Sequence, residues 1–335
     1  MVARGPEIRN DPIKVGNRVV APGRTARIEL PFAKVPTGSQ ESLPVAVVNG
    51  RGPGPHVWLS AAIHGDELNG VEIVRKVLRL LDAKTLRGAV IAVPIVNPLG
   101  FIIESRYLPD RRDLNRAFPG SPRGSTASRL AHLFMREVVS QCSVGIDLHT
   151  ATNHRINLPQ IRADTNNAAT LRLARAFGAP FIIHARHRDG SLRQAATELG
   201  ATVLVYEAGQ AHRFDDEAIE TGVMGVMRTL KSLRMIDVRL PRVGQTRVMR
   251  RTRWVRARRG GLANISVDLG DEVKRGDVVA TISDAFSTRP TGAIAPSGGF
   301  VVARTLRPLV NSGDALVHIA SEQGPYLDEP AERRR

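Results

Sequence analysis

The spacing of hydrophobic positions along the chain changes twice, and each change marks a different kind of structure. Residues 1–40 contain short segments in which apolar and polar residues alternate, a pattern that predicts β structure. Between residues 40 and 240, short continuous apolar runs alternate with longer segments whose apolar positions recur every three to four residues. Continuous apolar runs are typical of buried strands, and a recurrence every three to four residues is typical of amphipathic helices. This region therefore predicts an α/β fold, with a mostly parallel, twisted sheet covered by helices.

The same patterns place the individual elements of the α/β region. Strands are expected at residues 43–50, 56–63, 88–98, 142–149, 180–185 and 201–209. Helices are expected at residues 67–82, 125–141, 167–178 and 215–236, with Ser125 or Thr126 as the cap of the second helix. A chain of 335 residues has room for one domain of this size and for a smaller second domain.

Near residue 240 the pattern changes again, to short β-branched segments interrupted by glycine and proline. Two half-similar stretches, 265–282 and 295–319, resemble the barrel-sandwich hybrid of biotinyl and lipoyl carrier domains. Lys274 does not lie in the Met-Lys-Met or Asp-Lys-Ala turn that such carriers modify, so we expect a structural module rather than a cofactor arm. The expected organisation is an α/β domain with an N-terminal β segment over 1–240, a smaller all-β barrel-sandwich-like domain over 241–322, and a tail over 323–335.

Composition narrows the class of protein. No apolar run approaches the length of a membrane-spanning helix, and the first residues lack the apolar region of a signal peptide. The single cysteine, Cys142, cannot form an internal disulfide, which fits a reducing compartment. We expect a cytoplasmic protein without membrane association. Assembly into a homo-oligomer is compatible with the sequence.

The chain is strongly basic, with a formal net charge of +16 that comes mostly from arginine. The arginines are spread along the chain, with one local cluster at residues 250–260. Such a charge is compatible with binding of nucleic acid. However, aromatic residues make up only 4% of the chain, and no helix-turn-helix, zinc-finger or RNP pattern occurs. We therefore favour a solvated basic surface that attracts a small anionic substrate over a surface that binds nucleic acid.

Ionisable residues follow several of the expected strands, at the point where each strand ends. His64 and Glu67 follow one strand, His149 ends another, and Glu207 ends a third. In open α/β sheets, ligands collect beyond the carboxyl ends of the strands. Two histidines and a glutamate are the ligand set of many catalytic zinc sites, which keep a fourth position for water. The sequence therefore predicts a metal site formed by His64, Glu67 and His149, with Gly65 allowing the backbone to pass close to the metal.

Three other polar features near this edge have more than one interpretation. The segment 104–120 is too polar for a strand and too rich in proline and glycine for a helix, so we expect an ordered loop that contributes arginines to the site. Arg162 could contact the acyl or side-chain end of a substrate, or lie on the surface. Asp147 could orient a ligand, or cap a turn.

Four motifs, "HGDE", "DLNR", "DLHT" and "VYEAG", occur in the order and spacing of the succinylglutamate desuccinylase/aspartoacylase family of zinc carboxypeptidase-like hydrolases. The resemblance covers roughly residues 40–235, and the C-terminal β module is similar to the family's general plan. It implies that His64, Glu67 and His149 bind one Zn²⁺ per chain. It also implies that Asp113 accepts a hydrogen bond from His64, which fixes the tautomer of that ligand.

The resemblance also implies roles for residues that contact the substrate. Asn115 and Arg116 would bind its α-carboxylate, and Arg106 would polarise the scissile carbonyl. The inserted "YLPDRR" leaves Arg112 as an alternative to Arg106. Glu207 would be the general base, which accepts a proton from the attacking water and returns it to the departing amine.

The expected function is therefore zinc-dependent hydrolysis of the amide bond of a small anionic N-acyl amino acid. This is the activity of an aspartoacylase-like or succinylglutamate desuccinylase-like deacylase, which acts on a carbon–nitrogen bond other than a peptide bond. One alternative keeps the metal site and makes the protein a metallocarboxypeptidase of small peptides. Another is a non-catalytic protein that binds nucleic acid through residues 250–260.

Overall fold

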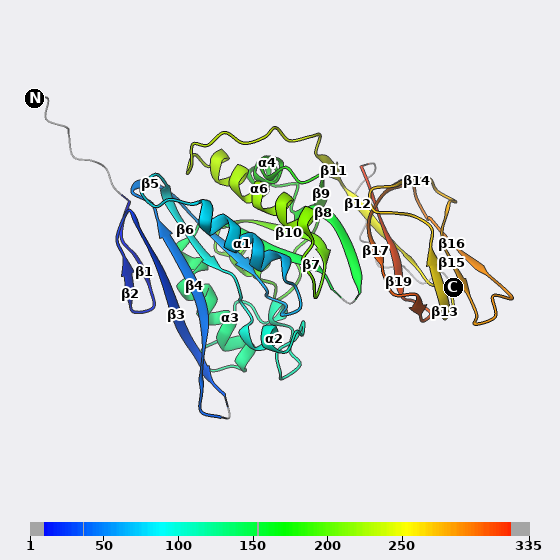
Figure 1. Cartoon of the computed structure of the whole chain (residues 1–335), viewed down its shortest axis with the longest axis horizontal. Coiled ribbons are helices and arrows are strands. Elements are labelled where there is room, and N and C mark those ends of the chain that lie inside the picture. The colour runs from blue at the N-terminus through cyan, green and yellow to red at the C-terminus, as the bar shows by residue number, and fades with distance from the viewer. Residues whose placement is uncertain (1–9, 36, 153, 323–335) are drawn as a thin grey trace, which may run out of the picture.

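The computed structural model describes residues 10–35, 37–152 and 154–322. Most of the strands in this part of the chain form one sheet of 13 strands. Its main path runs β12-β19-β17-β8-β10-β7-β5-β6-β4-β3, and helices cover both faces of its N-terminal half (Figure 1). The expected α/β fold, with a largely parallel centre and a C-terminal antiparallel region, is confirmed. No helix in these ranges is long and apolar enough to cross a membrane.

The strands of the first 240 residues are β1 (Ile13–Val15), β2 (Arg18–Val20), β3 (Arg24–Lys34), β4 (Gln40–Asn49), β5 (Gly52–Ala61), β6 (Arg87–Val93), β7 (Val144–Ala151), β8 (Arg155–Ala163), β9 (Phe181–His184) and β10 (Thr202–Gln210). The helices are α1 (Asn69–Leu80), α2 (Pro98–Ile102), α3 (Thr126–Glu137), α4 (Ala168–Phe177), α5 (Leu192–Glu198) and α6 (Asp216–Ser232), with short 3₁₀ turns η1 (Leu114–Arg116) and η2 (Val139–Gln141). Ser125 is the residue that caps α3, because its side chain accepts a hydrogen bond from the Ser128 amide.

The centre of the sheet consists of four neighbouring parallel strands in the order β10-β7-β5-β6. Parallel strands in register end at the same edge, so the residues that follow them are brought together. Antiparallel strands continue the sheet on both sides, with β4 beside β6 and β8 beside β10. Three of these four strands, β5, β7 and β10, carry the ionisable residues at or just after their ends.

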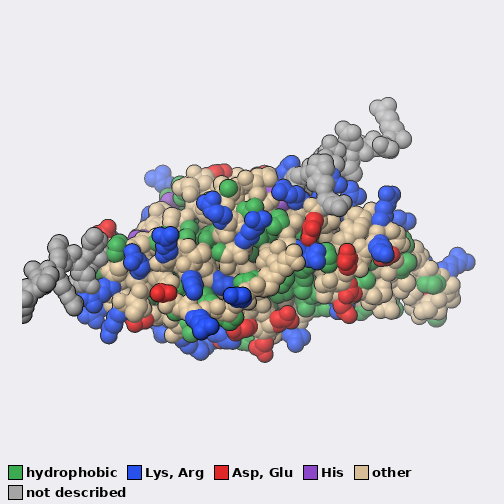
Figure 2. All heavy atoms as spheres, turned by 90° about the horizontal axis from the view of Figure 1, so that it is seen from above, with side chains coloured by type: hydrophobic (Ala, Val, Ile, Leu, Met, Phe, Trp, Pro, Cys, Tyr) green, Lys and Arg blue, Asp and Glu red, His purple; other side chains and the backbone are tan. Residues whose placement is uncertain are grey.

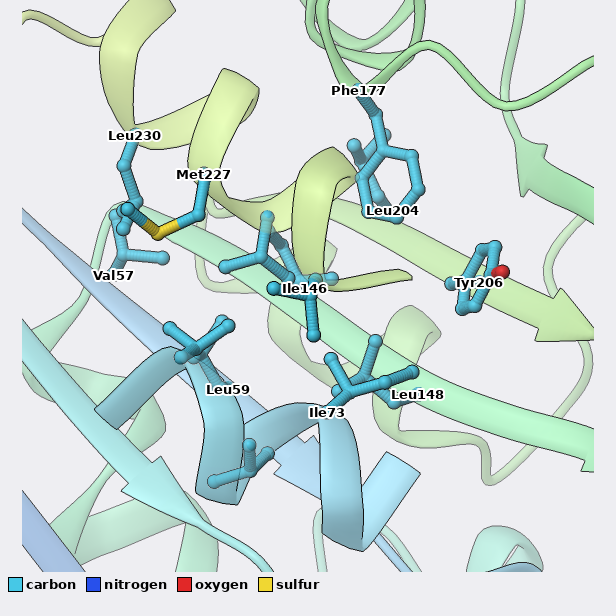
Figure 3. Packing of buried hydrophobic residues seen from close by; sticks show 14 of the residues in the cluster. Val57, Leu59, Ile73, Ile146, Leu148, Phe177, Leu204, Tyr206, Met227 and Leu230 are labelled. Atoms are coloured by element: carbon cyan, nitrogen blue, oxygen red, sulfur yellow. The ribbon is translucent and has the colours of Figure 1, made fainter. Parts of the chain in front are cut away.

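Alternate residues of the central strands pack into two separate cores. Leu59 belongs to the core beneath α1, α4 and α6, which Figure 3 shows, whereas its neighbour Trp58 belongs to the core beneath α3 and α5. In the first core, Ile73 of α1 and Phe177 of α4 pack against Tyr206 and other residues of the sheet. Both cores are composed of side chains that are almost fully buried, so the four strands form a rigid base for the site.

The strands after residue 240 are β11 (Arg247–Met249), β12 (Arg251–Arg256), β13 (Gly261–Ile265), β14 (Glu272–Val273), β15 (Val278–Ser283), β16 (Thr291–Ile294), β17 (Gly299–Thr305), β18 (Leu309–Val310) and β19 (Ala315–Ser321). Four of them form a second sheet in the order β16-β15-β13-β18. A third core, which includes Val279, Val301 and Leu316, lies among these strands.

The C-terminal strands are joined to the α/β region by backbone pairing. Strand β17 pairs with β8 in antiparallel register, with Ala303 opposite Asn157, so the large sheet continues across residue 240. The division into domains at 240 and 241 stays a proposal, supported by the separate third core. The expected tail, 323–335, and residues 1–9 lie outside the described residues.

Strand β8 and the helices α2 and α5 were not expected from the sequence, and helix α1 begins later than expected. Strand β8 contains Pro159 and several polar residues, which weaken a strand pattern, and α5 is only seven residues long. Helix α1 begins at Asn69 rather than at Glu67, because residues 64–67 form a turn closed by a 3.2 Å hydrogen bond from the Glu67 amide to the His64 carbonyl. His64 and Glu67 therefore share a turn that precedes the helix, and the expected helix start at Glu67 is wrong by two residues.

The contact between Gly145 and Trp58 generates a stability prediction. A Cβ atom on Gly145 would lie 1.9 Å from a ring carbon of Trp58, whose side chain is fully buried. The substitution Gly145→Ala should lower the free energy of unfolding by about 3 kcal/mol or more, because the ring cannot move within a packed core. Urea unfolding followed by circular dichroism measures the loss. Gly244→Ala is the matched control, since a Cβ there meets nothing within 4 Å. Equal stability of the two variants would contradict this packing.

Candidate functional site

Three buried side chains meet at the ends of β5 and β7. The Nδ1 atom of His64 lies 2.7 Å from one carboxylate oxygen of Glu67, and Nδ1 of His149 lies 2.8 Å from the other. One ligand atom from each of the three residues lies within 4.8 Å of the others, and all three side chains are buried. The structure therefore brings together the group that the sequence predicted as metal ligands.

The outer nitrogen of each histidine faces a second carboxylate. His149 Nε2 lies 2.7 Å from Asp147, which also accepts a 2.7 Å hydrogen bond from the Ser60 hydroxyl. His64 Nε2 lies 3.5 Å from Asp113, at the outer limit of a hydrogen bond. A carboxylate on the far nitrogen keeps the proton there and leaves Nδ1 free to coordinate a metal. The sequence left the role of Asp147 open. Asp147 lies two residues before His149 on one strand, so both side chains are on the same face, and this spacing could have indicated their contact.

The electrostatics of this group fit a divalent cation. Burial raises the pKa of Glu67, but the two imidazoles outweigh it and hold that pKa far below its usual range. Burial lowers the pKa of His149, whereas Asp147 and Glu67 together raise it well above its ordinary value. Three carboxylates therefore face two imidazoles that are themselves almost fully buried. A zinc ion suits this donor set, because it binds imidazole nitrogen and carboxylate oxygen and compensates the negative charge.

Close backbone packing positions the turn that carries His64 and Glu67. A Cβ atom on Gly65 would lie 2.1 Å from the backbone of Gly100 in α2, and the Gly65 amide donates a 2.9 Å hydrogen bond to the Ser105 carbonyl. Gly65 therefore makes room for α2, a contact that the sequence analysis did not foresee; that it also lets the backbone pass close to a metal stays a prediction. Ala62, just before the turn, has a φ of 48°, a strained conformation that reverses the chain direction after β5.

Glu207 lies on the strand beside His149. In the parallel pair of β10 and β7, Glu207 is the register partner of His149, and side chains of register partners lie on the same face. One carboxylate oxygen of Glu207 accepts a 2.9 Å hydrogen bond from the side-chain NH₂ group of Asn157. The other oxygen lies 3.8 Å from Nε of Arg162. Asn157 and Arg162 come from β8, so the strand that the sequence did not predict positions the carboxylate of Glu207.

The two arginines considered for the scissile carbonyl lie in different surroundings. Arg106 donates a 2.8 Å hydrogen bond to Asp113 and lies 3.8 Å from Glu67, with 17% of its side chain exposed. Arg112 has 63% of its side chain exposed, pairs with Asp110 and does not line the cavity at the site. Arg106 is thus the one of the two that reaches the buried group.

Asn115 and Arg116 lie at the mouth of the site on the short η1 turn. The carbonyl oxygen of the Asn115 side chain accepts a 2.9 Å hydrogen bond from the Leu192 amide at the start of α5, which leaves its amide NH₂ group for a ligand. Arg116 is exposed and also lines the cavity. The loop 104–120 is ordered as expected, and Asp113 caps η1 by accepting from the Asn115 amide.

A cavity of about 380 Å³ opens over these residues. It is lined by the predicted residues His64, Glu67, Arg106, Asn115, Arg116, His149, Arg162 and Glu207. Asp113, the other predicted residue, supports His64 and Arg106 from outside this lining. Residues that the sequence analysis did not identify also line it, namely Arg155, Asn157, Arg186, Arg188, Arg193 and Trp254. Trp254 lies on β12, so a strand of the C-terminal region forms part of the wall of the cavity.

Comparison with known proteins agrees with this geometry. The family model described as the succinylglutamate desuccinylase/aspartoacylase catalytic domain matches residues 53–233. The chain is 30% identical over 309 residues to N-alpha-acetyl-L-2,4-diaminobutyric acid deacetylase of Halomonas elongata, an alignment that covers 86% of this chain and 90% of that one. It is 26% identical over 212 residues to succinylglutamate desuccinylase of Pseudomonas aeruginosa, covering 58% of this chain and 62% of the relative.

Solved structures with the same fold include two with high coverage. A succinylglutamate desuccinylase/aspartoacylase from Rhodobacter sphaeroides superposes with a TM-score of 0.80 at 27% identity, covering 90% of this chain and 96% of the other. A product-bound ectoine utilization protein from Ruegeria pomeroyi superposes with a TM-score of 0.81 at 24% identity, covering 93% and 99%. The second likeness shows the fold alone. In both, the matched region extends beyond the catalytic domain into the C-terminal strands.

The hydrogen bond between Asp147 and His149 generates a prediction about metal affinity. The substitution Asp147→Asn should weaken zinc binding by about 10–100-fold, because the amide can no longer hold the proton on His149 Nε2. Competition with a chelating dye, monitored at fixed pH, measures the dissociation constant. Asp237→Asn, on the exposed segment after α6, is the control. Unchanged zinc affinity in Asp147→Asn would mean that this carboxylate does not support the ligand.

Proposed function

This chain belongs to the succinylglutamate desuccinylase/aspartoacylase family, and from that premise we propose that it is a zinc-dependent hydrolase of small N-acyl amino acids. One Zn²⁺ per chain would be held by His64, Glu67 and His149. The single observation that supports this proposal best is the convergence of these three ligands with Glu207 on one edge of the sheet. The reaction is hydrolysis of the amide bond, which releases a carboxylate and a free amino acid.

The bound metal would supply Lewis acidity and lower the pKa of a water molecule to roughly 7. Glu207 accepts the proton of that water as it attacks the amide carbonyl carbon. It then returns the proton to the amine nitrogen as the carbon–nitrogen bond breaks. Its hydrogen bond from Asn157 orients the carboxylate toward the cavity and leaves the other oxygen for the proton.

Arg106 stabilises the negative charge that develops on the carbonyl oxygen. Its guanidinium is held by Asp113 and lies near Glu67, so it is fixed before the substrate binds. Loss of one such donor typically lowers the rate by about 10²–10³. Asn115 and Arg116 bind the α-carboxylate of the substrate, since a guanidinium and an amide NH₂ can donate together to one carboxylate.

The charge of the cavity favours a substrate with a further anionic group. Three carboxylates line it, and each already has a partner: Glu67 faces the two imidazoles, Asp147 holds His149, and Glu207 accepts from Asn157. Arginines make up most of the other charged residues in the lining. A cationic side chain, such as that of the substrate named for the Halomonas elongata deacetylase, would have no free counterion here. Arg162 and Arg188 would instead bind a second carboxylate.

Substitution of Glu207 tests the mechanism. Glu207→Ala should keep its zinc and lose turnover by about 10²–10⁴, because proton transfer is removed while the ligands remain. Metal content and kcat on N-acyl amino acids are measured on the same preparation, with the exposed Glu220→Ala as the control. Full activity of a zinc-loaded Glu207→Ala enzyme would overturn the assigned role.

A panel of substrates tests the class. N-acetyl and N-succinyl derivatives of aspartate and glutamate should have kcat/KM values at least about tenfold above that of N-acetyl-diaminobutyrate, because like charges in a closed site are costly. N-blocked dipeptides are included to test the metallocarboxypeptidase alternative. Faster cleavage of the dipeptides would favour that alternative, and preference for the cationic substrate would contradict the charge argument.

A further inference from the structure

A second basic cavity adjoins the first, and three of the six arginines of the run 250–260, which the proposed reaction does not use, line it. Its volume is about 340 Å³. One side of it is formed by the end of β9 and residues 185–188, and the other side by residues 250–254 at the start of β12. Its lining consists of Arg162, Ile183, His184, Ala185, Arg186, His187, Arg188, Arg250, Arg251, Thr252, Arg253, Trp254 and His318. The two cavities share five of these residues, Arg162, Ala185, Arg186, Arg188 and Trp254.

Positive charge in this cavity is not balanced within its lining. Among the described residues, no aspartate or glutamate lines it. Two carboxylates outside the lining come near it: Glu207 lies 3.8 Å from Arg162, and Asp164 lies 3.9 Å from His184. Burial lowers the pKa of Arg188, and the charges of Arg162 and Arg116 lower it further. Guanidinium groups this close to one another repel, and an anion between them would remove the repulsion.

The buried wall of the cavity also contains a polar atom without a partner. His318 on β19 is stacked on Trp254, with ring centroids 4.3 Å apart and planes inclined by 2°. Burial and the charges of Arg162 and Arg155 lower the pKa of His318 to about 3, so its imidazole is neutral at physiological pH. Its Nδ1 atom is buried and has no hydrogen-bond partner. A neutral imidazole has one donor nitrogen and one acceptor nitrogen, so Nδ1 of His318 is a buried polar atom that no described residue satisfies.

The rest of the arginine run belongs to a different surface. Arg256 donates a 2.8 Å hydrogen bond to the Gly313 carbonyl, and Arg259 donates a 3.2 Å hydrogen bond to the Arg289 carbonyl. Neither residue lines a cavity with Arg250 and Arg253. On the face that Figure 2 shows, basic side chains of the described residues are dispersed among acidic and uncharged ones. The run is thus divided between a concave site and an open surface, which favours a small ligand over a nucleic-acid strand.

We propose that this second cavity binds a small multivalent anion, one with two or more carboxylate or phosphate groups. Planar, forked guanidinium donors match such groups in pairs, and the rim residues Arg250 and Arg253 would close over the ligand. The anion could be the far end of a long substrate that occupies both cavities, or a separate effector. In either case it would act on Glu207 through Arg162, which lines both cavities and lies 3.8 Å from that carboxylate.

Calorimetric titration of the zinc-loaded full chain with benzene-1,3,5-tricarboxylate tests the site. The three carboxylates of this probe point apart, so it cannot chelate one metal ion. The double variant Arg250→Ala/Arg253→Ala should weaken binding at least about tenfold, because charge-assisted donors are lost. The control Arg239→Ala/Arg258→Ala removes the same charge from exposed positions outside both cavities and should change the dissociation constant less than twofold. Thermal unfolding checks that both variants are folded.

Kinetics then distinguish the two sources of the anion. If the anion is the far end of a substrate, the probe competes with the substrate in the kinetics. The double variant Arg250→Ala/Arg253→Ala then raises KM for N-succinyl amino acids but not for N-acetyl amino acids. If it is an effector, the probe changes kcat and substrate does not displace it. The proposal would be overturned if both double variants lost binding of the probe equally, or if neither lost it. It would also be overturned if a duplex oligonucleotide bound more tightly than the probe and both variants weakened that binding equally. Because the titration needs no turnover, its result is independent of whether the proposed hydrolysis is correct.

Discussion

The site depends on one buried carboxylate that two imidazoles share. Glu67 lies between His64 and His149, and burial of an ionised carboxylate is costly unless opposite charge compensates it. The histidines compensate it, and Asp113 and Asp147 in turn face their outer nitrogens. The buried Glu67 carboxylate thus requires the histidines, and the buried histidines in turn require the aspartates. The arrangement consequently depends on a rigid sheet edge that brings several chain segments to within a few ångströms of one another.

The four parallel strands of the sheet form this edge. The antiparallel strands beyond β10 carry residues that line the cavity around it. Strand β8 connects the two parts, because it pairs with β10 on one side and with β17 on the other. Through β8, Asn157 and Arg162 reach Glu207, and through β12 a tryptophan of the C-terminal region reaches the cavity wall. The proposed chemistry at the metal and the proposed selection among anionic ligands are therefore assigned to different parts of one continuous sheet.

The sequence predicted the residues of the buried His64–Glu67–His149 group and Glu207 better than it predicted their surroundings. His64, Glu67, His149 and Glu207 end or follow strongly apolar strands, whose pattern is local and easily identified. Strand β8 was missed because Pro159 and its polar neighbours are tolerated only by virtue of the strands on either side. The contact of Gly65 with α2 was missed because it joins separate segments of the chain, which no local pattern records.

By itself, the sequence determined the alternation of strands and helices, the change to β structure near residue 240, and the kinds of residue that follow each strand. These properties depend on periodicity and on side-chain chemistry, which are local. Only the tertiary structure decided that Arg106 and not Arg112 reaches the buried group, and that the run 250–260 is divided between a cavity and an open surface. Both outcomes depend on distances between segments far apart in the chain, because electrostatic and hydrogen-bond energies are set by position in space rather than by order in sequence.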